Sequence, residues 1–206
     1  MPVNFQTSQT RENLMRAFAG ESQARNRYTF AAGQAKSQNL YVLQWVFEFT
    51  ANQEKEHAEI FYKHLTDCAG DTIQIDGGYP VDISTSMAQL LKMAHHNEYE
   101  EHDVVYKSFG ETAKEEGFLL AADSFLSIAK IEKIHGDRFQ LFAGLMERDA
   151  LFTGETEEDW ICLNCGHIHT GKTAPAACPV CHHNQGYFIR GAMMPLANPN
   201  GLSALM

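Results

Sequence analysis

Glu54-Lys55-Glu56-His57 and Glu132-Lys133-Ile134-His135 decide the fold of this chain. Each is a Glu-x-x-His sequence, and residues three positions apart lie on one face of a helix. A further glutamate precedes each motif at nearly the same spacing, Glu21 by 33 residues and Glu98 by 34 residues. This internal repeat predicts two helix pairs that face each other about a pseudo-twofold axis.

The repeated residues match the carboxylate-bridged di-iron or di-manganese site of a four-helix bundle. Carboxylates bridge two cations, imidazole adds a nitrogen ligand suited to iron, and four glutamates balance the charge of two Fe(II). Glu101 follows Glu98 by three residues, and its spacing fits a ligand or a solvated acidic face equally well. Tyr28 and Tyr106 fall near the inward face, where a phenol would hydrogen-bond a ligand carboxylate, although spacing alone favours core packing.

Apolar residues at three- and four-residue spacing predict an all-α four-helix bundle over residues 1–148. Residues 68–84 contain glycine and proline and are expected to cross from one side of the bundle to the other. Gly110 and Gly117 are expected to bracket a break. The four helices are expected at about residues 8–36, 40–68, 86–109 and 118–147.

Two Cys-x-x-Cys pairs, Cys162/Cys165 and Cys178/Cys181, are a strong signature of a metal held by four thiolates. In isolation this spacing permits zinc or iron and favours a structural zinc ribbon. A redox di-metal site on the same chain shifts the preference to iron, because iron donates single electrons and zinc does not. The chain is therefore divided into the bundle (1–148), an acidic linker (149–158), a small four-cysteine domain that needs its metal to fold (159–190) and an irregular tail (191–206).

Composition excludes several classes of partner. The chain has 16 Lys+Arg against 26 Asp+Glu, a formal net charge of -10, which disfavours nucleic acid and anionic membrane surfaces. No apolar run approaches the roughly 18 residues of a membrane span, and the N-terminal residues are too polar for a signal peptide. We therefore expect a cytoplasmic location, where clustered cysteines bind metal rather than form disulfides, and we expect Cys68 to be a small buried apolar residue.

Taken together, these residues resemble the rubrerythrin family, which joins a ferritin-like di-iron bundle to a C-terminal rubredoxin-like domain. The resemblance covers about residues 8–190 and includes Glu115-Glu116-Gly117-Phe118 and the pair Tyr187-Phe188 after the last cysteine. One departure is His182, which stands where a glycine commonly follows the second cysteine of a pair; histidine adopts the left-handed conformation more readily than most residues. The resemblance implies that the irons are bound by Glu21, Glu54, Glu98, Glu101, Glu132 and His135, with Glu54 and Glu132 bridging, His57 and Glu101 exchanging as ligands, and Tyr28 and Tyr106 supporting them.

The resemblance also implies an activity. A non-haem di-iron peroxidase would reduce hydrogen peroxide to water in defence against oxidative stress, with electrons relayed from a four-cysteine iron to the di-iron site. It would act as a head-to-tail homodimer supplied by a reductase or a small redox protein. Two alternatives stay open: a ferroxidase that handles iron with dioxygen, and a non-catalytic zinc-binding structural protein.

Overall fold

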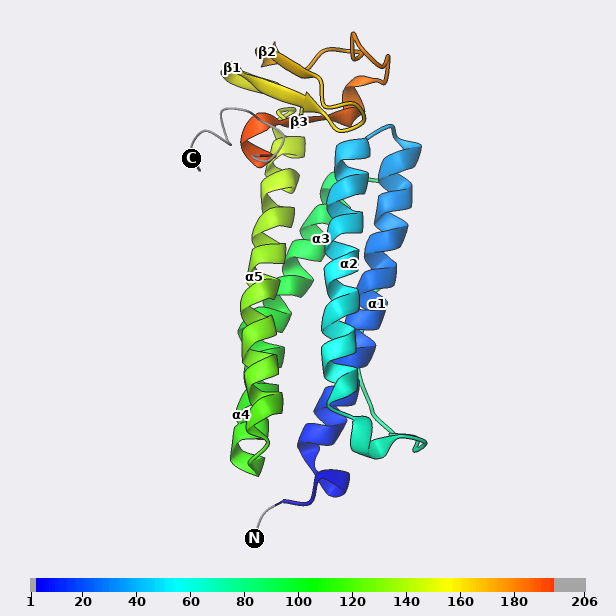
Figure 1. Ribbon diagram of the computed structural model, residues 1–206, viewed down its shortest axis with the longest axis vertical. Helices are drawn as coiled ribbons and strands as arrows, with labels where there is room; N and C mark the ends of the chain where they lie inside the picture. Colours follow the sequence, from blue (N-terminus) through cyan, green and yellow to red (C-terminus); the bar gives the residue numbers. More distant parts are fainter. Residues whose placement is uncertain (1–2, 195–206) are drawn as a thin grey trace.

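The computed structural model describes residues 3–194, so the expected tail lies mostly outside the described residues. Two antiparallel helix pairs form the bundle, and the crossover returns the chain to the end at which the cysteine domain sits (Figure 1). None of the helices within residues 3–194 is long and apolar enough to cross a bilayer. The helical elements are η1 (Phe5–Thr7), α1 (Gln9–Ser37), α2 (Tyr41–Lys63), η2 (Thr66–Cys68), α3 (Met87–Glu100), a π-helical turn (Glu101–Val105), α4 (Tyr106–Glu116) and α5 (Leu119–Glu147).

The third helical run differs most from the expectation. It was expected to end near residue 109, but it continues through the π-helical turn to Glu116, and only Gly117, with φ of +91°, ends it. Gly110 lies inside α4, where an added Cβ would stand 2.8 Å from the side chain of Leu126 in α5. That glycine therefore permits close packing of two helices instead of breaking one. The second helix, expected to reach residue 68, ends at Lys63.

The cysteine domain is a three-stranded antiparallel sheet in the order β2-β1-β3, built from β1 (Thr153–Cys162), β2 (Ile168–Thr173) and β3 (Phe188–Arg190). The stretch expected as a linker, 149–158, thus overlaps β1, because residues 153–158 are the first six of the ten residues of that strand. One of its acidic residues, Glu158, forms an ion pair with Arg190, which also donates to the carbonyl of Thr153 at 2.8 Å. Only residues 148–152 connect α5 to the sheet.

The two parts of the chain share one core. Phe47 and Phe139 of the bundle belong to the same buried cluster as Ile161 and Ile189 of the sheet. At this junction an added Cβ on Gly186 would lie only 1.7 Å from the backbone oxygen of Asn39, between α1 and α2. The absence of a side chain at Gly186 therefore allows the cysteine domain to sit directly on the end of the bundle.

Candidate metal centres

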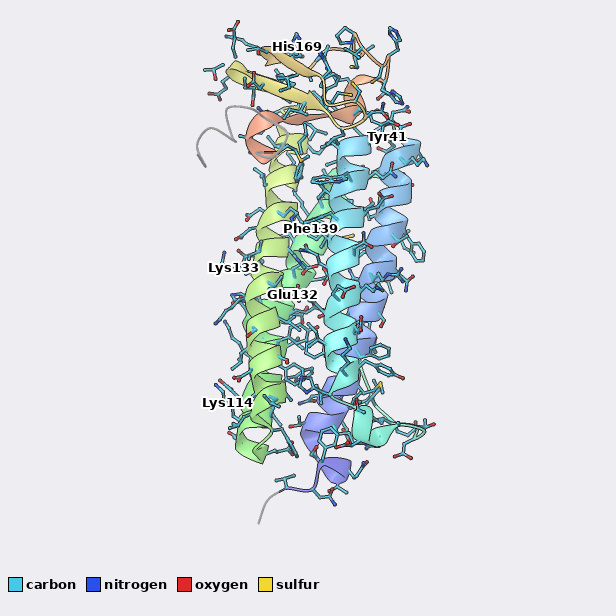
Figure 2. The ribbon with its side chains drawn as sticks, viewed as in Figure 1. Tyr41, Lys114, Glu132, Lys133, Phe139 and His169 are labelled. Carbon is cyan, nitrogen blue, oxygen red and sulfur yellow. The ribbon has the colours of Figure 1, made fainter. Side chains whose placement is uncertain are left out.

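The Glu-x-x-His residues and their partners meet in the interior, about midway along the bundle, where Figure 2 shows Glu132 on α5. Glutamates from α1, α2, α3 and α5 and histidines from α2 and α5 point inward, and all six are buried. Their ligand atoms form two groups, each lying within 4.8 Å. The first group is Glu21, Glu54, His57 and Glu132, and the second is Glu54, Glu98, Glu132 and His135.

The two groups have matching geometry. The Nδ1 atom of His57 lies 3.0 Å from Glu132 and 3.2 Å from Glu54. The Nδ1 atom of His135 lies 2.9 Å from each of the same two glutamates and 3.5 Å from Glu98. The histidine rings stand 5.5 Å apart and nearly parallel, at 15°. Glu54 and Glu132 belong to both groups, which is the arrangement that two bridging carboxylates require.

These side chains have polar atoms that the rest of the described protein leaves unsatisfied. The buried carboxylate oxygens of Glu54 and Glu132 and the Nδ1 atoms of His57 and His135 lie close to other members of the two groups but make no hydrogen bond to the surrounding residues that the structure describes. Burying ionisable groups in this way is costly unless they pair with charge or coordinate a metal. The oxygen and imidazole donors suit iron, so the residues present fit a pair of iron ions.

The pKa values show the same crowding of charge. Burial raises the pKa of Glu98 to about 8, and the carboxylate of Glu54 adds to the effect. Burial alone would lower the pKa of His57 and His135, but the surrounding carboxylates outweigh it and raise these values to about 9 and about 12. Glu54 is the exception, because the two histidines overcome its burial and lower its pKa to about 2. Without a metal, protons take the place of cations at this site.

Two tyrosines hold the outer glutamates. Tyr106 donates to Glu21 at 2.6 Å, and Tyr28 donates to Glu98. Both phenols are buried, and burial raises the pKa of each well above its usual value, so they stay protonated as donors. Spacing alone favoured core packing for these two tyrosines. They are buried in the core and also contact the glutamates of the site directly.

Glu101 lies apart from both groups. It is half-buried at the start of the π-helical turn, lines a cavity and belongs to neither donor group, although its carboxyl interacts electrostatically with Glu21 and Glu98. Burial and the charge of Glu98 raise its pKa well above the usual range. A π-helical turn adds one residue to a helical turn and is frequent at functional sites. This turn begins at Glu101, three residues after Glu98, where α3 passes into α4.

The crossover also contributes to the site, which sequence reasoning missed. Asp82 pairs with Arg27 of α1 at 2.5 Å and accepts from Asn97 of α3 at 2.7 Å. Asn97 directly precedes Glu98, so the crossover is fastened beside a donor of the second group. No spacing pattern marks Asp82, and its only signal is an acidic residue soon after Pro80.

The four cysteines form a second, separate centre at the end of the bundle. Their sulfurs lie within 4.8 Å of one another, with Cys162 and Cys181 at 3.7 Å and Cys165 and Cys178 at 3.6 Å. Four thiolates placed tetrahedrally at about 2.3 Å from a metal are separated by about 3.8 Å. Cys162 and Cys178 are buried and Cys165 is exposed, so one edge of the centre faces solvent.

The two cysteine loops have the same backbone pattern. The amides of Gly166 and His182 donate to the carbonyls of Cys162 and Cys178 at 2.8 and 2.9 Å. Both donors are left-handed, with φ of +77° for Gly166 and +62° for His182. The histidine therefore takes the conformation that the family pattern assigns to glycine.

Comparison with known proteins shows which family has these two centres. The rubrerythrin family model matches residues 12–143, and the model of the rubrerythrin rubredoxin-like domain matches residues 160–189. The chain belongs to the rubrerythrin family. It is 42% identical to a rubrerythrin of Clostridium perfringens over 88% of this chain and 93% of that protein, and 39% identical to a rubrerythrin of Nitratidesulfovibrio vulgaris over the same shares. A solved structure of fully reduced, all-ferrous nigerythrin is similar with a TM-score of 0.60 and 25% identity, covering 89% of this chain and 90% of that one.

Membership in the rubrerythrin family confirms the expected fold and set of cofactors. The family combines a di-iron domain of ferritin-like fold with a rubredoxin-like domain, and the described residues of this rubrerythrin supply a carboxylate and histidine site for the first and four cysteines for the second. Rubrerythrins are redox proteins associated with oxidative stress defence, and the chemistry of both centres is consistent with that role.

Proposed function

We propose that this protein is a non-haem di-iron peroxidase that reduces hydrogen peroxide to water. The observation that carries the proposal is the pair of overlapping donor groups, which share Glu54 and Glu132 and leave their oxygens free of other partners. Each peroxide takes up two electrons and two protons to give two water molecules. Two irons, when bound here, supply those two electrons.

The residues of the site have different roles in binding the irons. We assign the bridging positions to Glu54 and Glu132, which stand in both groups, and the terminal positions to the other five expected ligands. The phenols of Tyr28 and Tyr106 orient two of these carboxylates and place a proton beside each. The proposed iron ligands are Glu21, Glu54, His57, Glu98, Glu101, Glu132 and His135.

His57 and Glu101 support a change of ligands during turnover. His57 belongs to the first group, whereas Glu101 lines the cavity beside the site and belongs to neither group. One site with two alternative donors on different helices suits an iron whose preferred ligands change with oxidation state. In this arrangement His57 is the donor that is engaged.

Electrons would reach the di-iron site from an iron held by Cys162, Cys165, Cys178 and Cys181. Within one chain the centres are far apart: fifteen helical residues separate Glu132 from the end of α5, about 22 Å at the usual helical rise. Electron transfer slows steeply with distance, so we propose a head-to-tail homodimer in which the cysteine centre of one chain serves the di-iron site of the other. The exposed sulfur of Cys165 would receive electrons from a reductase or a small redox protein in the cytoplasm.

Anaerobic stopped-flow spectroscopy tests this proposal. Fully reduced, iron-loaded protein is mixed with hydrogen peroxide in one run and with dioxygen in another, and the return of the oxidised iron–thiolate absorbance is followed. The proposal expects much faster reoxidation by peroxide. Faster reoxidation by dioxygen would indicate a ferroxidase, and protein that carries zinc and no colour after growth with ample iron would indicate a structural role.

A further inference from the structure

One cavity of about 250 Å³ reaches the candidate di-iron site from outside the bundle. Glu101 and Tyr106, on the side of the site, line it together with Arg16 and Gly20 of α1 and Tyr79 of the crossover. Tyr106 is the residue that donates to Glu21. The cavity thus ends at two residues that belong to the site or contact it directly.

The crossover closes the outer side of this cavity and is fastened on both sides of it. Before the cavity, Asp76 pairs with Arg16 at 2.6 Å and also accepts from it through its backbone oxygen at 3.1 Å. After the cavity, Asp82 pairs with Arg27. Between these attachments the hydroxyl of Tyr79 donates to the backbone oxygen of Arg16 at 3.2 Å. The ring of Tyr79 is therefore held in place over the helix that carries Glu21.

Gly20 lines the cavity between Tyr79 of the crossover and Glu101. A Cβ added at Gly20 would lie 3.8 Å from the ring of Tyr79 and 4.0 Å from the carboxylate of Glu101. Both distances are ordinary van der Waals contacts, so the methyl group would fill the space between the two side chains. Gly20 is also in the interior of α1, where glycine is disfavoured by about 1 kcal/mol relative to alanine. The chain thus has glycine at a position where helix stability favours alanine and where a methyl group would fit.

We propose that this cavity is the route by which the peroxide substrate reaches Glu101 and the iron site, and that Gly20 and Tyr79 set its width. The inference rests on the proposed function, because it takes the donors behind Glu101 to hold the irons. A water molecule occupies about 30 Å³ in the liquid, and hydrogen peroxide is larger by a single oxygen atom, so it fits the cavity. Gly20 and Tyr79 both line this cavity beside Glu101, so the bulk of the side chains at these two positions determines how much room a larger organic hydroperoxide has in front of Glu101.

Two substitutions with opposite effects test the route. Gly20→Ala narrows the passage and preserves the helix, whereas Tyr79→Ala widens it and leaves both ionic attachments of the crossover in place. Gly33→Ala, in the same helix with nothing within 4 Å of an added Cβ, is the matched control for the first variant. Tyr62→Ala, an exposed tyrosine beside a different cavity, is the control for the second.

The readout is the rate at which azide, a small anion, binds to the oxidised iron-loaded protein, followed by its charge-transfer absorbance. It is measured together with the rate at which cumene hydroperoxide oxidises the reduced protein. We expect Gly20→Ala to slow azide binding about tenfold. We expect Tyr79→Ala to speed the reaction with cumene hydroperoxide about tenfold. A tenfold change in rate corresponds to a change in activation free energy of roughly one hydrogen bond or close contact. Both controls are expected to stay within about twofold of the parent protein.

The outcomes separate this inference from the proposed function. Parent-like azide and cumene hydroperoxide rates in Gly20→Ala and Tyr79→Ala, each with two irons in the bundle, would overturn the access route while leaving the peroxidase proposal intact. Altered azide rates in a protein that fails to turn over peroxide would support the route and overturn the activity. Absence of iron from the bundle of the parent protein would overturn both.

Discussion

The two metal centres are built in opposite ways. The four cysteines lie between residues 162 and 181, in two short loops whose backbone bonds are completed within a few residues. The bundle donors extend from Glu21 to His135 and come from four helices that only tertiary packing brings together. The local centre is positioned by the backbone of its two loops, whereas the bundle centre is positioned by a core of aromatic and aliphatic residues. The comparison teaches that one centre is specified by loop conformation and the other by helix packing.

Removing a shared donor is expected to have the largest effect. Glu54→Ala removes an oxygen donor from both groups, so we expect the loss of both bundle irons and a fall in peroxide turnover of at least about 100-fold, beyond the 10- to 100-fold typical of residues that only support ligands. The iron–thiolate absorbance should be unchanged, because the cysteine domain shares no ligand with the bundle. Iron content per chain and visible spectra measure both effects.

Glu56→Ala is the matched control, since Glu56 lies two residues away in the same motif and is exposed. It should keep both irons and full turnover. Two irons and unchanged activity in Glu54→Ala would show that the bridging assignment is wrong.

A substitution in the cysteine domain removes the other metal centre. Cys162→Ser removes one of four thiolates, and we expect the iron–thiolate colour to disappear while two irons stay in the bundle. Reduced protein should then react with peroxide once, but electrons from a reductase should no longer restore it. Single-turnover and steady-state assays of the same sample distinguish these steps.

Cys68→Ser provides the control for the thiol chemistry. Cys68 is buried near the lower end of the bundle and belongs to neither donor set among the described residues. Its variant should keep the colour and the steady-state rate. Retention of the iron–thiolate spectrum by Cys162→Ser would contradict the four-cysteine assignment.

The same contrast explains how much the sequence predicts. The cysteine pairs are adjacent in the chain, so their spacing alone indicates a metal site, and the repeat of Glu-x-x-His indicates the bundle because helical periodicity is regular. The π-helical turn at Glu101–Val105 has no such signal, because regular helical periodicity does not mark where an extra residue is inserted. For the same reason spacing could not show that Glu101 lines a cavity or that Asp82 is attached beside Asn97.

The bundle centre should also be distinguished by its response to pH when metal is removed. The pKa of Glu98 is raised to about 8 from 4.5, and that of His57 to about 9 from 6.5. A group with a raised pKa stabilises the fold while its proton is bound and loses that contribution as pH rises through the folded value. The metal-free bundle should therefore become less stable between about pH 6.5 and 9.

Thermal unfolding of the metal-free protein across this range measures the effect. One unit of pKa shift corresponds to about 1.4 kcal/mol, and 1 kcal/mol moves the midpoint by about 2–4 °C in a protein of this size, so we expect a decrease of at least about 3 °C. Iron-loaded protein should change less, because cations replace the protons, and Glu98→Gln should reduce the slope in the metal-free form. A metal-free midpoint that rises with pH would contradict the charge state assigned to the site.

The smallest expected effect lies within the cysteine domain, where the left-handed residue after the second cysteine is glycine in one loop and histidine in the other. Gly166 and His182 both have positive φ and both donate to the carbonyl of the first cysteine of their pair. A left-handed backbone costs an ordinary L-residue about 1 kcal/mol or slightly more, and glycine almost nothing. His182→Gly should therefore stabilise the metal-bound domain by up to about 1 kcal/mol, and Gly166→Ala, which has open space for its methyl group, should destabilise it by a similar amount. Denaturant titrations followed by the iron–thiolate absorbance report this domain alone. If His182→Gly instead lowers the stability, the histidine side chain itself supports the second loop. The similarity of the two loops is then limited to their backbone conformation.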